Sequence, residues 1–222
     1  MTKPKAKAYI DGANKKPDGL LHRYCKTIIS IAKHLCLSSK LSTMQYKILN
    51  KKDFDKFDKK ALYLWDEVFK HDPEYQRLRK KLKIKAKKPR LSWRMKRIRK
   101  KMQKKFNQKI WNELGKKCIE CGQCTMVCPT CFCFRFEDYS DKKRQRLLDS
   151  CFYHDFSEIS GGYMFLNNTA KRIYFWYYHK FVRIPREYNL PGCVECGRCS
   201  KVCPVGIEIE KVLREILKGG GK

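Results

Sequence analysis

Eight cysteines stand in two short runs with the same internal spacing. The first cysteine run is CIECGQCTMVCP, from Cys118 to Pro129, and the second is CVECGRCSKVCP, from Cys193 to Pro204. In each run three cysteines are separated by two residues, and a fourth follows three residues later, directly before a proline. This is the spacing of two-cluster ferredoxins, in which cysteine thiolates hold [4Fe–4S] clusters. The internal repeat therefore predicts two [4Fe–4S] clusters in a pseudo-twofold unit.

Each part of the repeat has a structural purpose. Three thiolates on one loop can bind three irons of one cluster, and Gly122 and Gly197 relieve crowding where the backbone approaches the inorganic sulfides. The fourth cysteine follows a turn of helix and is expected to reach the other cluster. We assign four ligands to the first cluster: Cys118, Cys121, Cys124 and Cys203. The second cluster then takes Cys128, Cys193, Cys196 and Cys199. Such crossed ligation would join both clusters in one rigid body, so that electrons pass between them without moving parts.

Two other uses of cysteine fit the pattern less well. Structural zinc needs four tetrahedral ligands and has no use for a third cysteine and a Cys-Pro step in each run. A disulfide framework belongs to an oxidising compartment, whereas the opening MTKPKAKAYIDG lacks the apolar segment of a secretory signal. Apolar stretches are also too short to span a bilayer. We therefore expect a cytoplasmic protein. We also expect apolar side chains near the runs to keep water from the clusters: Val127, Val194, Val202, Val205 and Ile207.

Residues 118–210 resemble a known family, the four-iron dicluster domain. This domain occurs in the beta subunit of archaeal cytosolic nickel–iron sulfhydrogenases and in the A subunit of anaerobic sulfite reductase. The resemblance lies in the extension CPTCFCF of the first run, in DSCFYHDFSEISGG from Asp149, in the HKF and PREY elements at His179 and Pro185, and in GCVECGRCSKVCPVGIEI from Gly192. It implies an electron relay between a flavin subunit that uses a nicotinamide cofactor and hydrogenase or reductase subunits. A relay subunit of an anaerobic oxidoreductase needs no catalytic site of its own.

Three further thiols, Cys131, Cys133 and Cys151, are left over from cluster ligation. With His154 they would supply four ligands for a third metal site. The alternative is that they are buried cysteines that act as small apolar side chains beside the first cluster. Two more cysteines, Cys25 and Cys36, have no partner in the pattern and are expected to be free thiols.

Positive charge is the second unusual feature of the chain. Lys and Arg number 52 against 22 acids, a formal net charge of +30. Residues 77–117 alone hold 20 basic residues and a single acid, Glu113, and so contribute +19. Three partners would balance this charge: acidic surfaces of neighbouring subunits, nucleic-acid phosphates, or anionic lipid. We favour acidic subunits, because no DNA- or RNA-reading motif is present. The alternative function is a nucleic-acid-binding protein with structural or sensory clusters.

The elements around the runs can be predicted from periodicity and caps. Residues 44–76 are helical in part, with a stripe of Leu62, Trp65, Val68 and Phe69. Asp72-Pro73 starts a helix that Pro89 should end. Ser92 caps a basic helix that continues to Gly115, with an apolar face of Met95, Ile98, Met102, Phe106 and Ile110. Two helices are expected after the first run, near Arg144–Phe156 and Ala170–Arg183 and separated by Gly161-Gly162, and another at Ile207–Leu217.

The predicted fold class is therefore α+β. It consists of a ferredoxin-like core with two [4Fe–4S] clusters and a helical insert between the cysteine runs, preceded by a basic, mainly helical N-terminal region. The predicted domains are a basic extension over residues 1–43, a basic helical region over 44–117 and the dicluster domain over 118–222, with the insert at 137–192.

Overall fold

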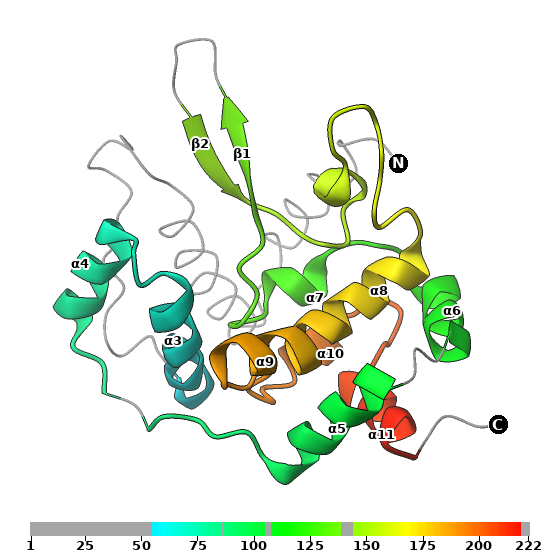
Figure 1. Ribbon diagram of the computed structural model, residues 1–222, viewed down its shortest axis with the longest axis horizontal. Coiled ribbons are helices and arrows are strands. Elements are labelled where there is room, and N and C mark those ends of the chain that lie inside the picture. The colour runs from blue at the N-terminus through cyan, green and yellow to red at the C-terminus, as the bar shows by residue number, and fades with distance from the viewer. Residues whose placement is uncertain (1–54, 86, 105–107, 139–143, 219–222) are drawn as a thin grey trace.

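The computed structural model describes residues 55–85, 87–104, 108–138 and 144–218. The predicted extension over residues 1–43, with Cys25 and Cys36, lies outside them. The described part is mostly helical, with one two-stranded sheet (Figure 1). Its elements are, in chain order, α3 (Lys56–Val68), α4 (Pro73–Leu82), α5 (Trp93–Lys104), α6 (Gln108–Lys117), α7 (Gln123–Met126), β1 (Phe134–Asp138), β2 (Arg144–Leu148), the 3₁₀ turn η2 (His154–Ser157), α8 (Thr169–Tyr178), the π-helical turn η3 (His179–Arg183), α9 (Ile184–Tyr188), α10 (Arg198–Lys201) and α11 (Ile209–Lys218).

The first two described helices begin at strong caps. Asp55 and Asp58 form a capping box at the start of α3. At the start of α4, the backbone amide of Tyr75 donates to the side chain of Asp72 at 2.9 Å, which confirms the predicted Asp72-Pro73 start. The predicted end at Pro89 is wrong, because α4 ends at Leu82 and Lys83 takes a left-handed conformation with φ 45°.

The basic segment contains two helices where the sequence indicated one. Ser92 is the predicted cap, and its hydroxyl accepts from the amide of Met95 at 3.2 Å. However, α5 and α6 are separate helices, and α6 continues past Gly115 to Lys117. Gly115 is needed for close packing, since a Cβ there would lie 3.0 Å from the backbone nitrogen of Ala170 in α8. Its role is to let α6 approach α8.

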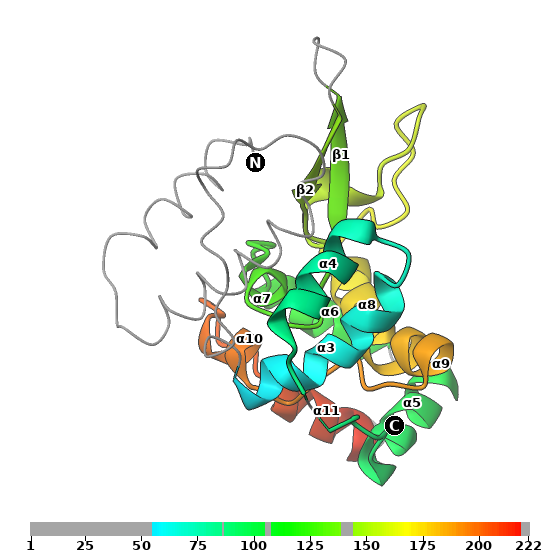
Figure 2. The same ribbon diagram turned by 90° about the vertical axis from the view of Figure 1, so that its left-hand side faces the viewer.

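The predicted helix at Arg144–Phe156 is also wrong. Residues Arg144–Leu148 form β2, which pairs antiparallel with β1 in a register that places Phe136 opposite Arg146. Pairing with a partner strand stabilises this segment, and periodicity within so short a stretch does not reveal it. The hairpin projects from the helical body in both Figure 1 and Figure 2.

The predicted helix at Ala170–Arg183 is confirmed and is longer than expected. It begins at Asn168, whose side chain accepts from the amide of Lys171 at 2.9 Å. It then passes from α8 through η3 into α9 with right-handed helical dihedrals at both junctions (Figure 1). Gly161 and Gly162, with φ of 89° and 76°, form the predicted break before it.

The apolar faces of the basic helices cover the cysteine-containing part of the chain. The largest core cluster joins side chains of α5 and α6 with those of α8 and η3, including Met95, Ile98, Trp111, Trp176, Tyr177 and Phe181. A second cluster joins Leu62 and Trp65 of α3 with Val194 of the second run. The described helices before residue 118 are therefore packed on the part of the chain that carries the cysteine runs. No helix in the described ranges has the length and apolar character needed to cross a membrane.

Candidate iron–sulfur site

The two cysteine runs have the same backbone conformation. Glu120 and Glu195 occupy equivalent positions with φ of 56° and 59°, and Gly122 and Gly197 follow with φ of 71° and 73°. Each glycine is the N-cap of a four-residue helix, α7 or α10, and these two helices pack against each other. Residues other than glycine rarely adopt the left-handed backbone conformation. Its repetition at matching positions therefore shows that the sequence repeat is also a structural repeat.

Backbone amides point at the sulfurs of both runs. The amides of Glu120 and Glu195 donate to the Sγ atoms of Cys118 and Cys193, each over 3.4 Å. The left-handed turn aims these amides back at the first cysteine of the run. Such N–H···S hydrogen bonds stabilise thiolates that carry iron and contribute to cluster potentials.

The four cysteines predicted for the first cluster line one cavity. The cavity is formed where the first run faces the end of the second, and its cysteines are Cys118, Cys121, Cys124 and Cys203, together with Cys199 on the side of the second run. Cys118 and Cys203 are close enough to interact electrostatically, although they are 85 positions apart in the sequence. The fold therefore brings the fourth cysteine of the second run to the three thiols of the first.

The reciprocal arrangement is found around Cys128. This cysteine interacts electrostatically with the second-run thiols of Cys193, Cys196 and Cys199. The fourth cysteine of the first run thus lies with the three thiols of the second. Cys124 of the first run also interacts with Cys128 and Cys199, so the two groups of thiols adjoin, and the division into two ligand sets stays a prediction.

The described cysteines can be compared with the geometry of a single zinc ion. A zinc ion with Zn–S bonds of about 2.3 Å would hold its sulfurs about 3.8 Å apart. Within the described ranges, no three cysteine sulfurs lie within 4.8 Å of one another. The described thiols thus do not have the geometry of an assembled zinc site.

Aromatic side chains from the insert form much of the cavity wall. Phe152, Trp176 and Tyr177 line it, together with the predicted Val205 and Ile207. Two other predicted wall residues are elsewhere in the core: Val127 and Val194 are buried outside this cavity, and Val202 is half-buried. The aromatic run in residues 174–178 could have indicated this wall, but helical periodicity does not show which cavity a helix covers.

Burial makes several of the predicted ligand cysteines poor acids, whereas hydrogen bonding with Cys131 and the nearby charge of Lys180 lower the pKa of Cys128. Desolvation raises the pKa of Cys118 to about 11, and the pKa values of Cys193 and Cys199 to about 12. Iron must therefore displace protons, and cluster insertion should release them.

The four residues of the predicted third site do not form one compact group. A hydrogen bond with Cys151 lowers the pKa of the Cys133 thiol, and Cys131 interacts with Cys128. His154 is exposed, and its Nδ1 lies 3.1 Å from a carboxylate oxygen of Asp155. A metal site of Cys131, Cys133, Cys151 and His154 stays a prediction.

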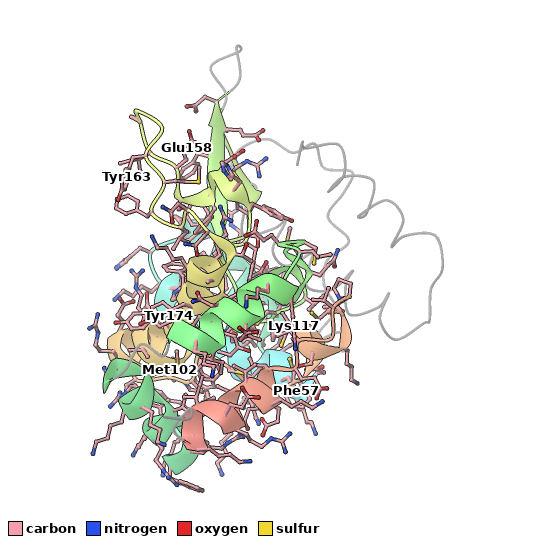
Figure 3. The ribbon with its side chains drawn as sticks, turned by 90° about the vertical axis from the view of Figure 1, so that its right-hand side faces the viewer. Phe57, Met102, Lys117, Glu158, Tyr163 and Tyr174 are labelled. Atoms are coloured by element: carbon pink, nitrogen blue, oxygen red, sulfur yellow. The ribbon has the colours of Figure 1, made fainter. Side chains whose placement is uncertain are left out.

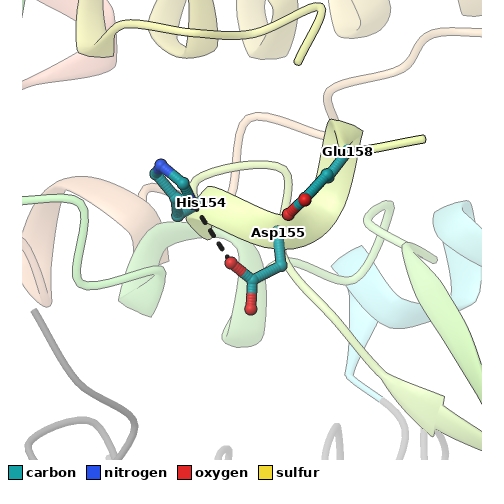
Figure 4. Close-up of side chains that lie close together, drawn as sticks. All are labelled: His154, Asp155 and Glu158. Atoms are coloured by element: carbon teal, nitrogen blue, oxygen red, sulfur yellow. Dashed lines mark hydrogen bonds and ion pairs between the residues drawn. The ribbon is translucent and has the colours of Figure 1, made fainter. Parts of the chain in front are cut away.

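His154 does belong to another group of potential ligands. It lies with Asp155 and Glu158 on η2 and the residue after it, and their ligand atoms are within 4.8 Å of one another (Figure 4). All three side chains are exposed. Figure 3 shows Glu158 on the same side of the molecule as Tyr163, away from Phe57 and Met102. We assign no metal ion to this group, because exposed acidic groups of this kind are common in proteins.

His179 packs among aromatic rings. Its ring centroid lies 5.7 Å from that of Phe132 and 5.9 Å from that of Phe175. Burial, with Lys180 and Arg183 nearby, lowers the pKa of His179 to about 4, so its imidazole is neutral at neutral pH. This is a packed histidine.

Sequence reasoning missed the buried cations around the runs. Arg198 of α10 is 8% exposed and donates to the carboxylates of Asp58 at 2.7 Å and of Asp55 at 2.5 Å. These ion pairs join the start of α3 to the second run. Lys180 of η3 is 2% exposed and lies beside Cys128. Long charged side chains are seldom fully buried without a partner, and sequence alone does not show the partner.

A basic groove opens above the second run. It has a volume of about 470 Å³, and its wall includes the basic side chains of Lys60, Lys87, Lys88 and Arg90. Cys193 and Val194 line its opposite side, with Glu195 as an acid. The groove thus places concentrated positive charge next to a predicted ligand of the second cluster.

Comparisons with known proteins concern the same part of the chain. Residues 117–207 match the family model described as a 4Fe-4S dicluster domain. The beta subunit of sulfhydrogenase 2 from Pyrococcus furiosus is 39% identical over 119 residues, which cover 51% of this chain and 35% of that protein. The chain thus spans about a third of the length of this relative. No solved structure matches.

Proposed function

We propose that this chain is the electron-transfer subunit of a sulfhydrogenase-like complex, because residues 117–207 match the 4Fe-4S dicluster domain model and the chain is similar to a sulfhydrogenase beta subunit. The proposal includes two [4Fe–4S] clusters with crossed ligation. The single observation that carries it is the meeting of each fourth cysteine with the three thiols of the other run. No observation supports the alternative of a nucleic-acid-binding protein.

The proposed task of the protein residues is to hold, insulate and connect the clusters. Each cluster, when bound, would take up and release one electron at a time. Cys118, Cys121, Cys124 and Cys203 would hold the first, and Cys128, Cys193, Cys196 and Cys199 the second. Trp176 and Tyr177 exclude water beside the first set. The packed pair α7 and α10 keeps the two sets at a fixed separation, so electron transfer between them needs no conformational change.

The basic groove suggests how an electron partner docks. Complementary charge accelerates encounters between proteins and orients them. An acidic partner seated on Lys87, Lys88 and Arg90 would lie against Cys193, which the same groove exposes. We propose that this groove, on the side of the second cluster, receives an acidic redox subunit or carrier protein.

Reversing the charge of the groove is expected to slow electron transfer from an acidic carrier. The probe is a reduced acidic two-iron ferredoxin, and the rate is followed by EPR on rapidly frozen samples. The triple variant Lys87→Glu/Lys88→Glu/Arg90→Glu should lower the second-order rate constant about tenfold or more at low salt, and the effect should shrink as salt rises.

The matched control is Lys96→Glu/Arg97→Glu/Lys100→Glu on the exposed face of α5, which changes the net charge equally. It should slow transfer much less. An equal loss in both triple variants would show that only overall charge matters, and a larger loss in the control would move the docking site to α5. Fully loaded protein that accepts no electrons from any reductant would contradict the relay function itself.

A further inference from the structure

Three cations are buried near the cysteine runs in the described part of the chain: Arg172, Lys180 and Arg198. Two of them are paired with carboxylates. Arg172 donates to Glu120 at 2.5 Å, and Arg198 is paired with Asp55 and Asp58. Their charges are thus largely balanced within the protein. Lys180 is different, because none of its contacts in the described ranges is a carboxylate.

The ammonium of Lys180 lies against a predicted cluster ligand. Its Nζ donates to the Sγ of Cys128 over 3.1 Å, to the hydroxyl of Thr130 over 3.0 Å and to the carbonyl oxygen of Gly192 over 3.4 Å. It also lies 5.6 Å from the ring centroid of Trp176. The side chain is 2% exposed, so water does not screen this charge.

The fold holds the ammonium in this place from several sides. Lys180 lies in the π-helical turn η3, and such turns are frequent at functional sites. A Cβ on Gly192 would lie 2.2 Å from the carbonyl oxygen of Lys180, so only glycine allows this approach. The hydroxyl of Thr130 donates to the carbonyl of Gly192 at 2.8 Å and closes the arrangement directly before Cys193.

The charge of Lys180 is directed to the second ligand set. Besides Cys128, it interacts electrostatically with the thiols of Cys193, Cys196 and Cys199, and also with Cys131 and Cys133, which belong to neither set. On the side of the first run the buried cation is Arg172, and its charge is balanced by Glu120, which lies between Cys118 and Cys121 in the sequence. The two halves of the repeat are alike in backbone but differ in buried charge.

We propose that Lys180 raises the reduction potential of the second cluster above that of the first. This inference rests on the proposed function, since it assigns unequal properties to the two proposed clusters. Reduction adds a negative charge to a cluster, and an unscreened cation bonded to a ligand sulfur stabilises the reduced form more than the oxidised form. An electron that enters the protein therefore rests on the second cluster, beneath the basic groove. Lys180 does not bind iron itself, and its charge acts on the cluster through the sulfur of Cys128.

The test is an EPR-monitored redox titration of the full chain with Lys180→Met. One of the two midpoint potentials should fall, and the other should stay unchanged. At the wild-type midpoint of the affected cluster, the ratio of reduced to oxidised cluster should fall at least tenfold, which corresponds to about 59 mV for a one-electron couple. Lys180→Gln, which keeps a hydrogen-bond donor without the charge, should give a shift of the same sign.

The matched control is Lys201→Met, which removes one exposed lysine from α10 near the same cluster. Solvent screens this charge, so both potentials should remain at their wild-type values. Unchanged potentials in Lys180→Met with full iron content would overturn the inference. Loss of the cluster from both Lys180 variants would also overturn it, because the lysine would then be needed for assembly. Wild-type protein without iron and sulfide would instead contradict the proposed function.

Discussion

Replacing Cys118 and Cys203 together by alanine is expected to leave one intact cluster, with about four irons and four sulfides per chain. In the crossed arrangement both residues serve the first cluster, which loses two of its four thiolates. The second cluster keeps all of its ligands. The measurement is iron and acid-labile sulfide per chain after anaerobic purification, with EPR of the reduced protein.

A matched double variant makes this prediction specific to crossed ligation. Cys118→Ala/Cys128→Ala removes two cysteines of the same run, and in the crossed arrangement it damages both clusters. If each run held its own cluster, Cys118→Ala/Cys128→Ala would leave one intact cluster, and Cys118→Ala/Cys203→Ala would damage both. Cys36→Ala, which changes a cysteine outside both runs, should keep about eight irons.

Arg198→Met is expected to destabilise the protein by about 3 kcal/mol, because it leaves the carboxylate of Asp58 buried without its cation. Asp58 is 1% exposed, and its pKa is already raised by burial, against which Arg198 acts. For a chain of this size the loss corresponds to an apparent melting temperature about 6–12 °C lower. Arg198 lies between Cys196 and Cys199, so the second cluster should also be lost sooner on heating.

The double variant Arg198→Met/Asp58→Leu separates charge from packing. With both partners apolar, no buried charge is left unpaired, and most of the lost stability should return. Melting should be followed at one fixed scan rate, since cluster loss makes unfolding irreversible. A double variant as unstable as Arg198→Met would show that the ion pair is not the cause.

The sequence was most informative where the chemistry depends on spacing. The two cysteine runs predict that Cys118 and Cys203, 85 positions apart, serve one cluster, and both residues line one cavity. Caps were equally informative, since Asp72 and Ser92 act locally on amides three residues away. These features can be predicted because each depends on residue types within a few positions.

Features that depend on distant partners could not be predicted in this way. Arg144–Leu148 is a strand because it pairs with β1. Gly115 does not end a helix but allows α6 to pack closely against α8. In the sequence Lys180 is one of 52 basic residues, and only the fold shows it buried against Cys128. Spacing thus identifies the predicted ligands, but not the buried charge beside them.

The central claim is that this chain holds two [4Fe–4S] clusters, and the most direct measurement is metal and sulfide content. Anaerobically purified full chain is predicted to contain about eight irons and about eight acid-labile sulfides, with a visible absorbance that reductant bleaches. One or two zinc ions per chain without sulfide would contradict the claim.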